Sequence, residues 1–201
     1  MKGLAIVIVG YQGAGKSLLA KSLIKGVHPT RLAILDINRE YVEQHPDSVV
    51  AVTEGPEKGE PDFDRYIEMM IKEKGKIFVT EDATVIFSHR GYDPNLVRAI
   101  IKKRHSGNVY IFLFHSLRVV PRDVFEYSDE LWLLKTADTD DSISGKYKGT
   151  GVQELLDEVR QLPEFEYSRK QKLPVRDEHY KVLFIKKAKV DKTVSKTPSQ
   201  E

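Results

Sequence analysis

A glycine-rich segment, GYQGAGKS at residues 10–17, constrains this chain more than any other part of its sequence. It matches the pattern G-x-x-x-x-G-K-[ST] at every fixed position. It also lies between an apolar run typical of a buried strand, LAIVIV at 4–9, and a helical pattern of leucines. In that context the backbone N–H groups of such a loop surround phosphate groups. The segment therefore predicts a P-loop that binds a nucleoside triphosphate.

Each part of this loop has an expected task. The glycines permit backbone angles that turn several N–H groups inward, and the helix that starts near Lys16 adds its positive dipole end. Lys16 is expected to reach the β- and γ-phosphates, and the Ser17 hydroxyl to bind Mg²⁺. We therefore expect Mg²⁺ and a triphosphate, taken as ATP, as cofactors. The nucleotide contacts are expected at Gly10, Tyr11, Gln12, Gly13, Ala14, Gly15, Lys16, Ser17 and Leu18.

Short apolar runs alternate with helical patterns along the rest of the chain. Strands are expected at 4–9, 31–37, 76–82, 109–114 and 130–135, with a short edge strand at 48–52 and a last edge strand or hairpin arm at 179–185. Helical patterns follow the P-loop and begin near Phe63, Pro94 and Val152. This order predicts a three-layer α/β fold, in which helices flank a mainly parallel central sheet.

Size and composition indicate one domain, residues 1–186, followed by a basic tail at 187–201. The chain has 201 residues and no cysteine, so disulfides and thiolate metal sites are excluded. No apolar run approaches the roughly 20 residues of a membrane span, and a cytoplasmic location is expected. The polar composition of the tail is typical of a disordered segment. Its lysines are also compatible with a polyanionic partner, although the disordered terminus is the favoured interpretation.

Hydrolysis needs an acidic residue that holds Mg²⁺ and a group that orients the attacking water. Glu81 and Asp82 follow an apolar strand and can divide this work, with Glu81 on the metal and Asp82 on the water, or in the reverse order. Alternatively, one of them caps the next segment. Asp36 also follows a strand, and we expect it beside the site or in control of the turn at 38–41.

Two further segments carry candidate catalytic groups. His115 and Ser116 follow the strand at 109–114, where a polar side chain often senses the γ-phosphate. Arg104 lies in the basic run KKRHSG just before that strand. It is a candidate arginine finger, which would neutralise transition-state charge at a neighbouring subunit's nucleotide. The alternative is a cation that complements the C-terminal end of a helix dipole.

The order of these motifs resembles the HerA/FtsK superfamily of DNA-pumping ATPases, especially its small viral genome-packaging members. The P-loop is followed by LDINREY at 35–41, which is similar to the D-x-x-x-E-Y stretch of that superfamily. IFVTED at 77–82 looks like its acidic Walker B motif, and Arg104 precedes the sensor strand as its arginine finger does. FHSLRVVP at 114–121 resembles its sensor segment, although the usual glutamine is absent and the usual acidic order, Asp then Glu, is reversed.

The resemblance spans roughly residues 3–137 and implies several properties that the residues alone do not. It implies a sheet with the strand order 5-1-4-3-2 and a homo-oligomeric ring, commonly a hexamer or pentamer, with nucleotide between subunits. It implies double-stranded DNA as a partner, together with a capsid or portal protein. The expected location is then the host cytoplasm or the virion vertex.

Four other functions are alternatives to a DNA-translocating motor. A GTPase needs an N-K-x-D motif, and the nearest segment, KTAD at 135–138, lacks the asparagine and has the wrong spacing. A small-molecule P-loop kinase usually has an arginine-rich lid, whereas the arginines here are scattered. A zonula occludens toxin-like phage assembly or secretion ATPase usually carries a membrane anchor. The acidic pair at 81–82 argues against a nucleotide switch that does not hydrolyse.

Overall fold

The computed structural model describes residues 2–49, 63–89, 94–143, 145–162 and 179–185. Their centre is one six-stranded sheet with the order β2-β3-β4-β1-β5-β6. The strands are β1 (Leu4–Val9), β2 (Leu32–Leu35), β3 (Ile77–Thr80), β4 (Val109–Phe114), β5 (Glu130–Leu134) and β6 (Tyr180–Phe184). The first five are parallel, and β6 pairs antiparallel with β5.

This topology confirms the α/β fold expected from the sequence. The strand order 5-1-4-3-2 holds for the first five strands, and β6 adds a sixth strand at the β5 edge. The expected edge strand at 48–52 is reduced, among the described residues, to one parallel bridge between Ile34 and Val49. Residues 50–52 lie outside the described part of the chain.

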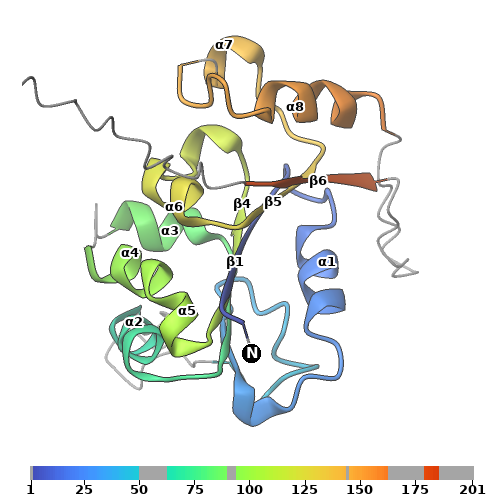
Figure 1. Cartoon of the computed structure of the whole chain (residues 1–201). Helices are drawn as coiled ribbons and strands as arrows, with labels where there is room; N and C mark the ends of the chain where they lie inside the picture. The colour runs from blue at the N-terminus through green and yellow to red at the C-terminus, as the bar shows by residue number, and fades with distance from the viewer. Residues whose placement is uncertain (1, 50–62, 90–93, 144, 163–178, 186–201) are drawn as a thin grey trace, which may run out of the picture.

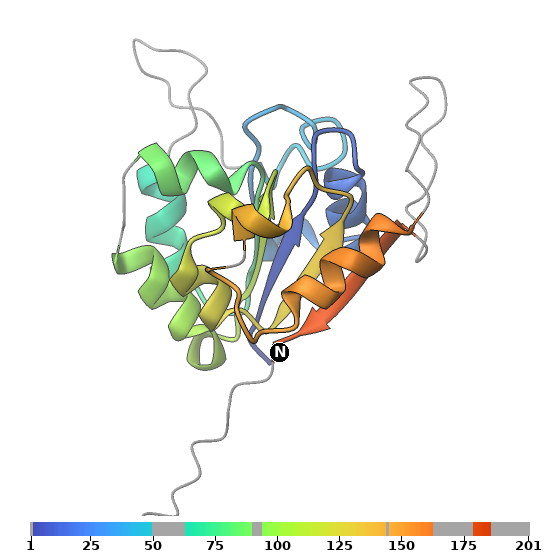
Figure 2. The same ribbon diagram turned by 90° about the horizontal axis from the view of Figure 1, so that it is seen from above.

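Helices cover both faces of the sheet, but unequally. Helix α1 (Lys16–Leu23) lies on one face, and helices α2 to α5 lie on the other (Figures 1 and 2). The helices of this second face and the top of the molecule are α2 (Phe63–Lys72), α3 (Ala83–His89), α4 (Pro94–Ile101), α5 (Lys103–Ser106), α6 (Arg122–Tyr127), α7 (Asp140–Ile143) and α8 (Val152–Arg160). The described residues also form two 3₁₀ turns, η1 (Pro29–Arg31) and η2 (Leu117–Val119). No helix among the described residues is long and apolar enough to span a membrane.

The alternation of side chains along the strands divides the core in two. On the α1 face, Ile8, Ile34 and Val79 pack with Leu19 and Ile24 of the helix segment. On the opposite face, aromatic residues of β3 and β4 pack against α2, α3 and α4, with Phe78 and Tyr110 stacked at a centroid distance of 5.4 Å. Strands β1 to β4 are thus buried on both faces, as their continuous apolar sequences predicted.

The parallel strands bring four segments to one edge of the sheet. Their carboxyl ends lead into the P-loop after β1, the Asp36 turn after β2, the acidic pair after β3 and His115 after β4. Ligands of open α/β sheets bind at this edge. The candidate residues from distant parts of the sequence therefore meet there.

Candidate functional site

The P-loop is held to the sheet by its own backbone. Gly10 N–H donates to the Phe114 carbonyl at 3.1 Å, and Tyr11 N–H donates to the Lys135 carbonyl at 2.8 Å. Gly15 is the N-cap of α1 at a φ of 96°, and no side chain caps the helix. The first N–H groups of α1 therefore remain available to an anion, which is the condition for phosphate binding.

Lys16 is buried at the base of this loop, with 7% of its surface exposed. Its ammonium donates to the Tyr11 carbonyl at 3.0 Å and lies 3.2 Å from Nδ1 of His115. Burial lowers the pKa of Lys16, and the charges of Asp82, Glu40 and Glu81 oppose that shift. A phosphate group would add negative charge around the ammonium and stabilise its charged form.

Ser17 and Glu81 lie together, as a shared metal site requires. The Ser17 hydroxyl donates to Oε1 of Glu81 at 3.1 Å. Only 3% of Glu81 is exposed, and its Oε2 atom is buried without a hydrogen-bond partner among the described residues. Burial, followed by the neighbouring carboxyl of Asp36 and the charge of Glu40, raises the pKa of Glu81 to about 8.

These observations fit a Mg²⁺ ion held by the Ser17 hydroxyl and the Glu81 carboxylate. A buried carboxylate oxygen without a partner is costly, and an oxygen ligand is what Mg²⁺ prefers. The positive charge of the ion would also reverse the effects that now favour the protonated form of Glu81.

Asp82, the second acid after β3, lies beside His115. Its Oδ2 atom lies 3.4 Å from Nε2 of His115, and its Oδ1 atom is buried without a partner among the described residues. Its backbone has a φ of 44°, which is uncommon for a residue other than glycine. The chain therefore bends at Asp82, and the two acids have different contacts: Glu81 accepts from Ser17, whereas Asp82 lies beside His115.

Asp36 controls the turn after β2, which was one of its two expected roles. Its carboxylate accepts the N–H groups of Glu40 at 2.9 Å and Tyr41 at 2.7 Å. The buried Tyr41 in turn directs its hydroxyl to the Ser17 carbonyl at 3.4 Å. Asp36 thereby connects the β2 edge with the start of α1.

The structure brings His115, rather than Ser116, to the cavity. His115 lines it and contacts both Lys16 and Asp82. The Ser116 hydroxyl instead donates to Oδ1 of Asp138 at 2.5 Å and caps η2. Oδ2 of Asp138 accepts the Leu117 N–H at 2.7 Å. Both carboxylate oxygens of Asp138 are thus engaged, which leaves none for a guanine base.

Arg104 lies at the opposite end of the sheet from the P-loop. It is exposed on the short helix α5, which is separate from α4 and precedes the amino end of β4. At about 3.3 Å per residue, the six residues of β4 separate Arg104 from the site by roughly 17 Å or more. Arg104 therefore does not line the cavity of its own chain. A role in hydrolysis requires a second subunit.

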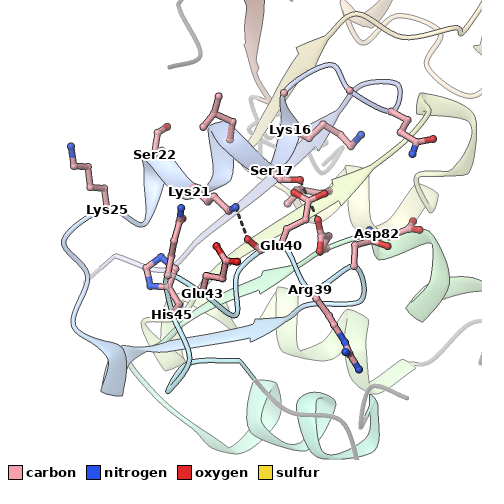
Figure 3. Close-up of a pocket in the computed structure, with 18 of the residues that line it drawn as sticks. Lys16, Ser17, Lys21, Ser22, Lys25, Arg39, Glu40, Glu43, His45 and Asp82 are labelled. Carbon is pink, nitrogen blue, oxygen red and sulfur yellow. Dashed lines mark hydrogen bonds between the residues drawn. The ribbon is translucent and has the colours of Figure 1, made fainter. Parts of the chain in front are cut away.

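A cavity of about 1240 Å³ joins the candidate residues (Figure 3). Beside the P-loop, Glu81, Asp82 and His115, it is lined by Lys21 of α1, by Lys25 just after that helix, and by residues 38–40 and 43–45 after β2. In the sequence, Glu40 stands out only as part of the LDINREY motif. The cavity extends toward this segment because the Asp36 hydrogen bonds turn it back over α1.

Comparisons with known proteins identify the fold. No model of a known protein family matches the chain, and no curated protein matches it. The genome packaging NTPase B204 from Sulfolobus turreted icosahedral virus 2, in complex with AMP, is similar at a TM-score of 0.62 and 15% identity, over 92% of this chain and 94% of that chain. B204, the DNA-packaging ATPase from Sulfolobus turreted icosahedral virus, is similar at a TM-score of 0.58 and 18% identity, over 82% of this chain and 90% of that chain. These similarities confirm the P-loop ATPase fold.

Proposed function

We propose that this chain hydrolyses ATP with Mg²⁺ and works in a homo-oligomeric ring that moves double-stranded DNA during the packaging of a viral genome. The observation that supports this most is the joint placement of Lys16, Ser17, Glu81, Asp82 and His115 around one P-loop. The same fold occurs over almost the whole length of a viral packaging NTPase. A capsid or portal protein is the proposed partner.

In this proposal each residue has a task. The P-loop N–H groups and Lys16 bind the phosphates, and Ser17 and Glu81 would hold Mg²⁺, which neutralises charge on the phosphate oxygens when it is bound. Asp82 accepts a hydrogen bond from the attacking water. His115 detects the γ-phosphate, a role supported by its contacts with Lys16 and Asp82. Arg104 would come from a neighbouring subunit.

One observation favours a second candidate, a small-molecule kinase. The cavity extends past the P-loop along Lys21, Lys25 and His45, where it offers space for an acceptor molecule. A kinase would transfer the γ-phosphate to that acceptor, whereas the motor would transfer it to water.

ATP hydrolysis with and without double-stranded DNA tests the proposal. We expect DNA to stimulate turnover, and we expect Lys16→Ala to reduce it at least about 10²-fold because the phosphates lose a buried cation. Lys72→Ala is the matched control, since Lys72 is exposed on α2 and, among the described residues, pairs with Glu68 of the same helix. Turnover retained in Lys16→Ala would show that the P-loop is not the active site. A phosphorylated metabolite without DNA stimulation would favour the kinase.

A further inference from the structure

Glu40 contributes a further carboxylate to the cavity, from a strand that the proposed catalytic residues do not use. It follows β2, whereas Glu81 and Asp82 follow β3. It lines the same cavity as Ser17 and Glu81, and Figure 3 shows it on the α1 side of that cavity. The side chain is exposed at the mouth, so its carboxylate remains accessible to water.

The backbone of Glu40 is fixed on both sides. Its N–H donates to Asp36 at 2.9 Å, and its carbonyl accepts from the Lys21 ammonium at 2.6 Å (Figure 3). Arg39 adopts the left-handed conformation, with a φ of 58°, so the chain reverses immediately before Glu40. These bonds use only the backbone of Glu40. The turn therefore presents a carboxylate that its own stability does not require.

The charge of Glu40 acts on the centre of the site. It raises the pKa of Glu81 and opposes the lowering of the pKa of Lys16. A third negative group next to Glu81 and Asp82 would repel a triphosphate if no cation bound between them. Glu81 supplies the independent sign of such a cation, because it is 3% exposed and its Oε2 atom has no hydrogen-bond partner in the described part of the chain.

We propose that Glu40 belongs to the metal site and holds, from the β2 side, a water molecule bound to the Mg²⁺ that Ser17 and Glu81 ligate. Mg²⁺ in nucleotide sites usually keeps several waters, and residues that orient them affect the affinity for the metal. Among the described residues, no three acidic or histidine side chains are arranged to ligate a metal directly. A contact through water agrees with that arrangement. This inference rests on the proposed function.

Mn²⁺ titration, followed by electron paramagnetic resonance in the presence of AMPPCP, tests the role of Glu40. We expect Glu40→Gln to weaken Mn²⁺ binding about 10-fold, and to leave metal-free AMPPCP binding equal or tighter. Glu43→Gln is the matched control, because Glu43 lines the same cavity and lies three residues away. It removes the same charge, and we expect it to change neither affinity.

Two results would overturn the inference: unchanged Mn²⁺ affinity in Glu40→Gln, or an equal loss in both variants, which would show only a general effect of charge. Thermal unfolding of each variant verifies that the Asp36 turn is intact. If the unaltered protein bound neither AMPPCP nor Mn²⁺, the proposed function itself would fail. If it bound both and Glu40→Gln bound them equally well, only the role of Glu40 would fail.

Discussion

The two ends of the sheet differ in the pairing of their buried polar groups. Asp36 and Asp138 at the carboxyl end are paired, as are the groups at the amino end, but Glu81 and Asp82 are not fully paired. At the amino end, Lys103 pairs with Asp129 at 3.1 Å and donates to the Tyr127 carbonyl. Asn108 at the same end bonds to the Lys76 N–H, the Glu73 carbonyl and the Tyr110 hydroxyl. At the carboxyl end, buried oxygens of Glu81 and Asp82 have no partner among the described residues.

This difference separates stability from function. Paired buried groups lower the free energy of the folded state, whereas unpartnered ones raise it and are retained where a ligand satisfies them. Substitutions at the amino end should therefore reduce stability and leave the chemistry intact. Substitutions of Glu81 or Asp82 at the carboxyl end should instead impair the chemistry without reducing stability. Arg104 is the proposed exception, because it lies at the amino end without a buried contact.

The largest effect is expected from Arg104→Ala. Nucleotide binding and thermal stability should stay unchanged because the side chain is exposed, while ATP turnover should fall about 10³-fold, or roughly 4 kcal/mol, as for a lost arginine finger. Steady-state hydrolysis and nucleotide titration measure the two quantities. Lys102→Ala is the control, since Lys102 is the exposed cation next to this helix.

A mixing experiment decides whether Arg104 acts across subunits. The Arg104→Ala protein is combined with a Glu81→Gln, Asp82→Asn double variant, each inactive alone. Mixed rings would contain sites that pair an intact acidic pair with an intact Arg104, so part of the activity should return. If no ratio restores turnover, the amino end of the sheet has no direct role in hydrolysis. Its residues would then serve stability alone.

The second effect is a loss of stability in Lys103→Ala. Only 1% of Lys103 is exposed, and its removal leaves Asp129, 24% exposed, without its cation. Breaking a buried pair on one side costs about 3–5 kcal/mol, and the partial exposure of Asp129 reduces the expected loss to about 2–4 kcal/mol. Urea unfolding measures it, with Lys102→Ala again as control. A stability loss below about 0.5 kcal/mol would refute the structural role of the amino end.

The two ends also differ in how far the sequence predicted them. The P-loop could be predicted because its motif, strand and helix are contiguous, and the strands at 4–9 and 109–114 have the predicted bounds. The strand predicted at 31–37 is shorter, Leu32–Leu35. Arg31 belongs to η1, and Asp36 leaves the sheet to bind the Glu40 and Tyr41 N–H groups.

Contacts between distant residues could not be predicted. The choice between His115 and Ser116 depends on Asp138, which lies 22 residues from Ser116 and binds its hydroxyl. The exposed position of Arg104 on α5, a helix separate from α4, could not be predicted from its basic run alone. The pairing of Lys103 with Asp129 had no local signal, because both residues look like surface charges in the sequence.

The smallest effect is expected from Glu81→Gln in the metal-free protein, and its sign is opposite to that of Lys103→Ala. The pKa of Glu81 is raised from 4.5 to about 8 in the folded state. The folded protein therefore binds more protons than the unfolded chain between these values, and its stability falls as the pH rises through that range. Glutamine does not titrate, so the variant lacks this loss.

Urea unfolding in EDTA at pH 5.5 and pH 8.5 measures the difference. The site is open to water through the cavity, so the effect should be small. We expect the difference in free energy of unfolding between the variant and the unaltered protein to be only about 1 kcal/mol more favourable to the variant at pH 8.5 than at pH 5.5. Glu43→Gln, an exposed change in the same cavity, should show no such dependence. A variant that is less stable than the unaltered protein at pH 8.5 would mean that the charged Glu81 is already well paired. The carboxyl end would then be stabilised in the same way as the amino end, and the case for a bound cation would lose its structural support.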